Sequence, residues 1–242
     1  MVRGEVTLAG RTPQGEPLTL RPFRYRDEEA FLEARRRDRD WLVQWDPTNP
    51  DGTPPTGTYR SMLRRQRSRV RNKETLAFLI EMQGEIVGQI NGNSIMWGAA
   101  RSFSAGYWVA SHAAGRWIAP TAVALLGDYG FGSLGLHRLE LGIRPENAAS
   151  LAVPRKLVMR DEGLRPNFLH IDGAWRDHRI FALTAEDLHG DGWGGTFGER
   201  LARSWSAGSD EADKLDEPGE PDELGERDEP DERGEPGELD EA

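Results

Sequence analysis

Hydrophobic and polar positions alternate along much of this chain, and the alternation predicts a protein rich in strands. LTLRPFR at 18–24 and HRLELGIR at 137–144 show the two-residue period of a strand whose two faces have different neighbours. Similar runs predict strands at 75–82, 86–95, 102–110, 160–171 and 174–184. Short connections such as Asp172-Gly173 predict tight hairpin turns between neighbouring strands.

Helical patterns separate these strands. Asp27 is a candidate N-cap for a helix over 28–45, which would have Glu28 and Glu29 in its first turn. Further helices are predicted at 59–75, 120–136 and 145–159, whereas 185–208 is Gly-rich and stays unassigned. The resulting order, β-α-α-β-β-β-α-β-α-β-β, indicates an α+β (mixed α/β) domain with one central sheet.

Charge divides the chain into a body and a tail. The 242 residues carry a formal net charge of −10, but 209–242 alone contains 17 Asp or Glu residues against three Lys or Arg residues. Residues 1–208 therefore carry about +4. The tail repeats E-P-G-E and D-E-P and has no aromatic residue, so its composition predicts disorder. It is interpreted as a solubilising extension or as a shield of the basic body against nucleic acid.

Missing residue types and spacings narrow the chemistry. The chain has no Cys, which excludes disulfides, thiolate nucleophiles and Cys-based zinc sites. No run approaches 18 apolar residues and no signal-peptide core is visible, so we expect a cytoplasmic protein without a membrane span. Metal-ligand spacing such as H-E-x-x-H is absent, so no metal is expected. We expect His137 to be structural, and His170 and His178 to be surface imidazoles, although either could reach a site.

The stretch VASHAAGRWIAPTAV at 109–123 predicts an anion-binding loop. Gly115 permits a tight turn before a helix that begins at Ile118 or Pro120, and the first amides of a helix have no acceptor within it. Such a helix end attracts phosphate, and Arg116 adds a full positive charge. The flanking strands end at GYWV and at GIRPENAAS. We expect these strand ends to diverge and leave a cleft for a long ligand whose pyrophosphate lies on the loop.

These motifs together resemble the GNAT acyltransferase family, most closely its RimJ/RimL-type branch, which includes ribosomal-protein-alanine N-acetyltransferases. The resemblance is carried by LTLRPFRYRDEEAF, GEIVGQI, AGYWV, AGRWIAPTAVALL, FGSLGLHRLELGIRPENAAS and DGAWRDHRIFAL. It implies a GNAT domain over 18–187 with a mostly antiparallel mixed sheet, flanked by helices and splayed at the cofactor cleft. It leaves 1–17 as an N-terminal extension, 188–208 as a Gly-rich segment and 209–242 as the tail.

The resemblance also implies acetyl-CoA as the cofactor. Backbone amides from 114 to 119 would bind the diphosphate, and the strand edge at 107–109 would bond the pantetheine arm. The implied cofactor-binding residues are Tyr107, Trp108, Val109, Ala114, Gly115, Arg116, Trp117, Ile118, Ala119 and Asn147. Several have simpler interpretations, because Asn147 is a typical helix cap and Tyr107 and Trp108 fit an ordinary strand.

The implied reaction is a direct transfer of an acetyl group to a primary amine. The amine attacks the thioester, and an N–H near Val109 stabilises the tetrahedral oxyanion. Ser150 and Asn147 are the implied catalytic residues, with Ser150 protonating the departing thiolate, although either residue also suits helix capping. Asp46 and Glu81 are candidates for the base, although both are more typical of surface or structural carboxylates.

The sequence departs from the family pattern at elements that handle the cofactor. Trp117 replaces the second glycine of the loop, where a positive φ would suit glycine. Pro154 lies inside the following helix, where other members place a general-acid tyrosine. Val158 replaces a glycine usual at that helix end, and Gly127 and Gly130 interrupt the preceding helix. A catalytically impaired protein therefore stays an alternative.

The acceptor side is assigned to Trp41, Trp45 and the loop 46–58. The leading acceptor is a protein N-terminal amine, and a small-molecule amine such as an aminoglycoside is the alternative. A different class, an RNA- or ribosome-binding module, is suggested by the basic segment 60–73, although a solvated helix face is the simpler interpretation. Its basic residues are Arg60, Arg64, Arg65, Arg67, Arg69, Arg71 and Lys73. The oligomeric state stays open between monomer and homodimer.

Overall fold

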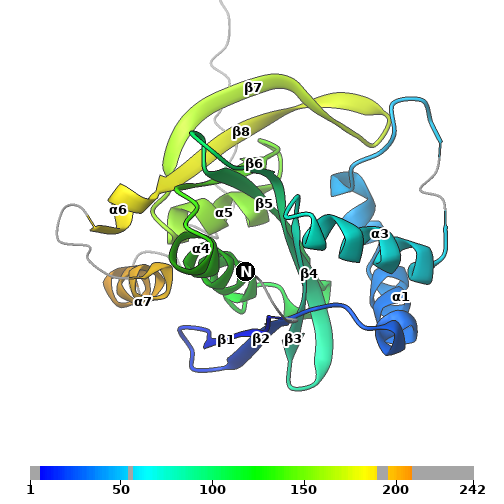
Figure 1. Cartoon of the computed structure of the whole chain (residues 1–242), viewed down its shortest axis with the longest axis horizontal. Coiled ribbons are helices and arrows are strands. Elements are labelled where there is room, and N and C mark those ends of the chain that lie inside the picture. The colour runs from blue at the N-terminus through cyan, green and yellow to red at the C-terminus, as the bar shows by residue number, and fades with distance from the viewer. Residues whose placement is uncertain (1–5, 54–56, 190–195, 209–242) are drawn as a thin grey trace, which may run out of the picture. The chain divides into compact units, whose positions relative to one another are not determined.

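A single mixed sheet organises the part of the chain that the computed structural model describes, residues 6–53, 57–189 and 196–208. Its eight strands have the order β1-β2-β3-β4-β5-β6-β8-β7 (Figure 1). All neighbouring pairs are antiparallel except β5 and β6, which are parallel. The strands are β1 (Leu8–Arg11), β2 (Pro17–Arg21), β3 (Leu76–Met82), β4 (Glu85–Met96), β5 (Ser102–Val109), β6 (Arg138–Ile143), β7 (Arg160–Ile171) and β8 (Ala174–Thr184). The predicted fold class is confirmed, whereas the predicted disorder of 209–242 concerns residues outside those described.

Helices cover both faces of this sheet. They are α1 (Glu28–Arg37), α2 (Arg39–Leu42), α3 (Tyr59–Arg71), α4 (Ile118–Asp128), α5 (Ala148–Lys156), α6 (Ala185–His189) and α7 (Phe197–Gly208). Three short segments, η1 (Tyr25–Asp27), η2 (Val43–Trp45) and η3 (Ser111–Ala113), are 3-10 helices, and η4 (Tyr129–Ser133) is a short π-helix. We call the side on which α1 and α3 pack over β3–β5 the α1 face, and the side on which α4, α5 and α7 pack the α4 face (Figure 1).

The two glycines that interrupt α4 in the sequence have a packing role. A Cβ on Gly127 would lie 2.7 Å from the Phe197 ring, and one on Gly130 would lie 2.6 Å from the Phe103 ring. Phe103 and Phe197 are both fully buried in the core of the α4 face. The helix therefore continues to Asp128 and widens into η4, because bare backbone lets both rings approach closely.

Part of the segment predicted as an N-terminal extension, 1–17, is paired in the sheet. Leu8–Arg11 forms β1, and Pro17 already belongs to β2, with Leu8 paired to Leu20 and Arg11 to Pro17. LAGR has almost no alternation of its own, so only pairing with β2 makes it a strand.

The prediction of one helix over 28–45 is also wrong. The helix breaks at Asp38, whose buried carboxylate accepts hydrogen bonds from the Ser111 N–H, at 3.3 Å, and from its hydroxyl. Asp27 does not cap α1. Its carboxylate instead accepts from the Arg24 N–H and from the buried Arg21 guanidinium, which also binds Glu81. Glu81, a candidate base, is thereby held in a structural ion pair.

Candidate active site

Strands β5 and β6 pair only over their first residues and then part. Their register runs from Ser102–Arg138 to Ala105–Leu141, although β5 continues to Val109 and β6 to Ile143. Beyond this point β5 stays bonded to β4, and β6 stays bonded to β8. The expected divergence of the two strand ends is therefore present within one continuous sheet.

The divergence leaves amides of β5 directed into the gap. Ala110 N–H donates to the Val87 carbonyl of β4 at 2.8 Å, and successive amides of a strand point to opposite edges. The N–H groups of Tyr107 and Val109 therefore point toward the side that β6 has left. An extended ligand arm could bond here as another strand would.

The loop after β5 presents further amides at the start of α4. The N–H groups of Gly115, Arg116, Ile118 and Ala119 have no acceptor among the described residues, whereas Ala114 N–H donates to the Ser111 carbonyl at 3.2 Å. Gly115 has φ +80° and nothing within 4 Å of a notional Cβ. A cradle of free donors at a helix N-terminus is the arrangement that binds phosphate, so the residues present fit a diphosphate.

Trp117 does have the left-handed backbone for which its position favours glycine, with φ 59° and ψ 15°. Its indole is only 8% exposed and belongs to the core of the α4 face. Lys156 Nζ of α5 lies 4.2 Å from the ring centroid. The side chain is thus packed toward α5, and the strain of the left-handed backbone is offset by burial.

Arg116, predicted to add a free charge to the loop, forms an ion pair. Its guanidinium binds the carboxylate of Glu16, which lies just before β2. This contact fastens the N-terminal hairpin to the loop. No local pattern indicates this contact, because one hundred residues separate the two partners.

Asn147 and Ser150 lie at the start of α5, on the same side of the sheet as α4. The Asn147 Oδ1 accepts from the Ser150 N–H at 3.0 Å, so Asn147 caps the helix. The Tyr107 hydroxyl donates to the Ser150 carbonyl at 3.4 Å. Burial raises the pKa of Tyr107 well above its usual value, so the phenol keeps its proton. β5 and α5 thus meet at the gap through two of the predicted residues.

Trp41 and Trp45 contact the two strands that part. Trp41 Nε1 donates to the Val109 carbonyl of β5 at 3.3 Å. Arg144, which follows β6, lies over the Trp45 ring at 5.2 Å and donates to the Gln44 carbonyl at 2.9 Å. The structure therefore brings the predicted acceptor residues to the mouth of the gap.

Trp108 points away from the α4 face. Its ring packs on Phe31 of α1 at 6.2 Å, and Arg35 stacks over it at 5.3 Å. Arg35 also binds Asp46, so this second candidate base is held in an ion pair.

Two of the histidines in the last hairpin lie in different surroundings. His170 is half-buried and contacts Thr48 Oγ1 through Nδ1 at 2.8 Å. His178 is only 3% exposed, so its assignment to the surface is wrong. Its Nδ1 lies 3.0 Å from the Arg176 carbonyl, and burial lowers the pKa of the imidazole below its usual value. His178, Ile180 and Ala182 lie two residues apart on the same face of β8, and all three are buried. This alternation could have indicated the burial of His178.

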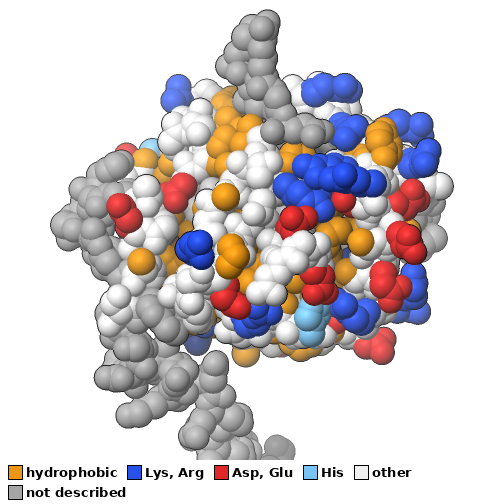
Figure 2. All heavy atoms as spheres, turned by 90° about the horizontal axis from the view of Figure 1, so that it is seen from below, with side chains coloured by type: hydrophobic (Ala, Val, Ile, Leu, Met, Phe, Trp, Pro, Cys, Tyr) orange, Lys and Arg blue, Asp and Glu red, His pale blue; other side chains and the backbone are white. Residues whose placement is uncertain are grey.

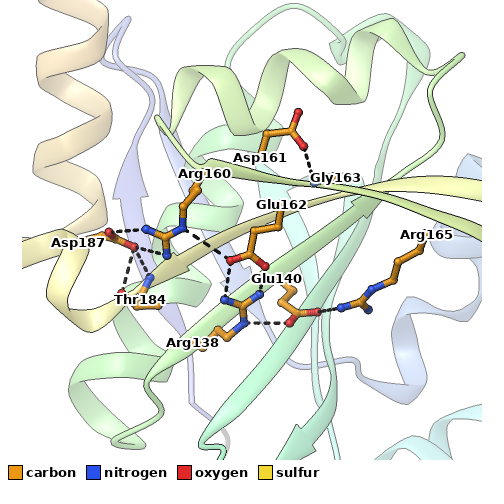
Figure 3. A network of polar contacts seen from close by, with 9 residues as sticks. All are labelled: Arg138, Glu140, Arg160, Asp161, Glu162, Gly163, Arg165, Thr184 and Asp187. Carbon is orange, nitrogen blue, oxygen red and sulfur yellow. Dashed lines mark hydrogen bonds and ion pairs between the residues drawn. The ribbon is translucent and has the colours of Figure 1, made fainter.

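A network of charged residues fixes the hairpin that carries His178 (Figure 3). Arg138 of β6 donates to Glu140 at 2.9 Å and to Glu162 of β7, also at 2.9 Å, across the small side chain of Ala182 on β8. Arg165 of β7 lies 3.6 Å from Glu140. The neighbouring carboxylates keep the pKa of Arg138 above its usual value. These charges tie three strands together on the α1 face beside the gap.

Two further properties concern what the described residues lack. No helix in the described ranges is long and apolar enough to cross a membrane. Within those same residues, no three His, Asp or Glu side chains are grouped to hold a metal ion.

A sheet that parts beside a helix N-terminus, whose first amides have no acceptor among the described residues, is an arrangement that suits an extended ligand carrying phosphate. A model of the family described as "Acetyltransferase (GNAT) domain" matches residues 17–160. The chain therefore belongs to the GNAT acetyltransferase family, and the predicted resemblance and enzyme class are confirmed.

The chain is similar to several relatives and solved structures. The solved structure of Mycobacterium smegmatis RimJ in complex with CoA-disulfide is 36% identical, with a TM-score of 0.75, and covers 82% of this chain and 94% of that one. "Probable N-acetyltransferase YjcK" of Bacillus subtilis is 28% identical over 72% of this chain and 97% of its own. The "[Ribosomal protein uS5]-alanine N-acetyltransferase" of Escherichia coli is 24% identical over 70% of this chain and 89% of its own.

Proposed function

We propose that this protein transfers the acetyl group of acetyl-CoA to a primary amine, namely the N-terminal amine of a ribosomal protein. The observation that carries the proposal is the parting of β5 and β6 beside four amides, just before and at the start of α4, that have no acceptor in the part of the chain described. The similarity to RimJ, which was solved with a CoA derivative, and to a uS5-alanine N-acetyltransferase supports the cofactor and the acceptor.

Each group of residues around the gap has its own proposed role. The amides of Gly115, Arg116, Ile118 and Ala119 would hold the diphosphate, and the N–H groups of Tyr107 and Val109 would bond the pantetheine arm and the oxyanion. Acetyl-CoA supplies the acetyl group as a thioester. Ser150 would donate a proton to the departing sulfur, and Asn147 would hold the first turn of α5, and so Ser150, in place. Trp41 and Trp45 would flank the acceptor.

Isotope-labelled acetyl-CoA tests the proposal directly. The acceptors are a peptide with the N-terminal sequence of an alanine-starting ribosomal protein, the same peptide with a blocked N-terminus, and an aminoglycoside. We expect label in the free peptide alone. Label in the aminoglycoside alone would overturn the acceptor, whereas binding of acetyl-CoA in calorimetry without any transfer would show an impaired enzyme. Ser150→Ala should lower kcat by about tenfold to a hundredfold with unchanged cofactor affinity.

We also propose that helix α3 contacts ribosomal RNA, which surrounds an acceptor that is a ribosomal protein. α3 carries six Arg and no acidic residue, and Arg64 and Arg71 are exposed without an ion-pair partner among the described residues. Figure 2 shows Lys and Arg gathered on the side of the molecule where α1 and α3 lie, mixed with acidic side chains. One such acid, Glu28, lies 3.7 Å from Arg60, so part of the charge is neutralised.

Charge reversal separates RNA contact from a solvated helix face. Binding of the full chain to ribosomal RNA is measured at several salt concentrations for Arg64→Glu and for Arg36→Glu on α1, which makes the same change of net charge. We expect Arg64→Glu alone to weaken binding and to reduce the slope against salt by about one. Equal effects of both variants, or no binding, would remove this contact.

A further inference from the structure

Two glycines face each other across the point where β5 and β6 part. The last paired residues are Ala105 and Leu141, so Gly106 and Gly142 are the next in register. Side chains at these positions would lie on the α1 face, and both glycines are exposed. A Cβ on Gly106 would lie 3.4 Å from Asn93 Nδ2, and one on Gly142 would lie 3.5 Å from Phe168. The gap is therefore bordered by bare backbone on this face.

His178 lies beside that gap. A Cβ on Gly142 would be 4.0 Å from its Cδ2, and the Phe168 ring stands edge-on to the imidazole at 5.6 Å. The Arg176 carbonyl can only accept a hydrogen bond, so Nδ1 carries the hydrogen and Nε2 keeps its lone pair. Nε2 has no hydrogen-bond partner among the described residues.

Burial favours the neutral form of the His178 ring, and the surrounding charges act in both directions. Arg144, after β6, disfavours the charged form of the imidazole. Arg165 on β7 is the cross-strand partner of His178. Asp177 on β8 and Glu146, before α5, act in the opposite sense but less than burial does. A neutral imidazole with one free, basic nitrogen is the form required of a proton acceptor near pH 7.

Resting on the proposed function, we infer that His178 Nε2 accepts the proton that the acceptor amine must lose, and that the amine reaches the thioester from the α1 face between Gly106 and Gly142. Ser150 and Tyr107 lie on the α4 face, so the donor for the sulfur and the acceptor for the amine stand on opposite sides of the sheet. Asp46 and Glu81 are held by Arg35 and Arg21. Of the three candidates Asp46, Glu81 and His178, His178 is thus the one that no arginine holds in an ion pair among the described residues, and it lies beside the gap.

The protons balance in this arrangement. The acceptor ammonium gives one proton to Nε2, which leaves an amine with a lone pair and an imidazolium. The lone pair forms the C–N bond and gives the tetrahedral oxyanion, whose collapse breaks the C–S bond. The new amide nitrogen keeps one hydrogen. The other leaves as a proton and passes to Ser150, where it replaces the proton that Ser150 gives to the sulfur. His178 then releases its proton to solvent.

The test compares His178→Gln and His178→Ala with His137→Gln, a control at the far end of β6, where His137 contacts Glu186. We expect kcat/KM to fall about a hundredfold in both His178 variants, with acetyl-CoA affinity in calorimetry unchanged. The acid limb of the pH profile should disappear in His178→Gln, and added imidazole should partly restore His178→Ala. The control should stay within threefold of the wild type.

A second measurement does not depend on activity or on the variants folding. Long-range proton–nitrogen NMR of the wild-type chain should show His178 with a protonated Nδ1 and a bare Nε2 near pH 7. A protonated Nε2, or a His178→Gln variant with wild-type kcat/KM and pH profile, would overturn the role of His178 alone. Absence of transfer by the wild-type protein would instead remove the proposed function, and this inference with it.

Discussion

The hydroxyl of Tyr107 takes the place of a helical N–H that Pro154 cannot provide. In α5 the Ser150 carbonyl would accept from the amide four residues later, but that residue is Pro154. Tyr107 donates to the same carbonyl at 3.4 Å instead. The family's usual tyrosine at position 154 is thus absent, and a phenol from β5 stands at the first turn of the same helix.

This relationship predicts that Tyr107 and Pro154 are energetically coupled. Tyr107→Phe leaves a carbonyl unpaired and should lower the free energy of unfolding by about 1 kcal/mol. In a Pro154→Ala background the new amide competes for the Ser150 carbonyl, so the same change should cost less than half as much. A double-mutant cycle by urea unfolding measures the difference. Equal costs in both backgrounds would contradict the substitution of one donor for the other.

Replacement of Val158 with glycine should stabilise the protein. It has φ 51°, a left-handed conformation that a β-branched residue strongly disfavours, and its side chain is 45% exposed. Val158→Gly should raise the free energy of unfolding by about 1 kcal/mol. Val43 is the matched control, because it is 47% exposed with φ −56°. Val43→Gly should lower stability by about 1 kcal/mol, and a loss at both sites would contradict the assigned strain.

Gly130 and Gly132 should respond oppositely to alanine. A Cβ on Gly130 would lie 2.6 Å from the buried Phe103 ring, so Gly130→Ala should lower the free energy of unfolding by about 1–3 kcal/mol. Nothing lies within 4 Å of a Cβ on Gly132, where alanine should be neutral or stabilising by up to about 1 kcal/mol. Thermal unfolding of the two variants gives the comparison. Similar effects at both positions would mean that the ring contact is unimportant.

Stability should fall in acid because of His178. Burial lowers the pKa of the folded imidazole below the usual 6.5, so the unfolded chain binds more protons there. The contribution of His178 is fully present above about pH 6.5 and is lost as the pH falls toward the folded pKa. Urea unfolding from pH 7.5 to 5 should show a steeper decline for the wild type than for His178→Gln. Parallel declines would show that His178 titrates alike in both states.

Strong periodicity made the central elements predictable, whereas contacts distant in sequence decided the rest. The strands at 75–110 and the final hairpin around Asp172 and Gly173 lie within a residue or two of the predicted bounds, and both turn residues have positive φ. The break at Asp38 follows from a bond to Ser111, 73 residues away. No local pattern could have shown it.

The parts of the candidate site that depend on the backbone were predictable from the sequence. The contacts that its side chains form were not. The loop glycine and the helix start at Ile118 follow from local chemistry. The pairing of Arg116 with Glu16 and the inward turn of Trp117 follow from the packing of α4 against β2 and α5. His178 was assigned to the surface because its residue type outweighed the alternation of its strand.

The short β5–β6 ladder also limits how the two halves of the sheet are joined. Among the described residues, four register pairs, from Ser102–Arg138 to Ala105–Leu141, link the strands β1–β5 to the strands β6–β8. A molecule bound in the opening would contact both halves of the sheet. The stability of the sheet and its unfolding temperature should therefore depend on the concentration of that molecule.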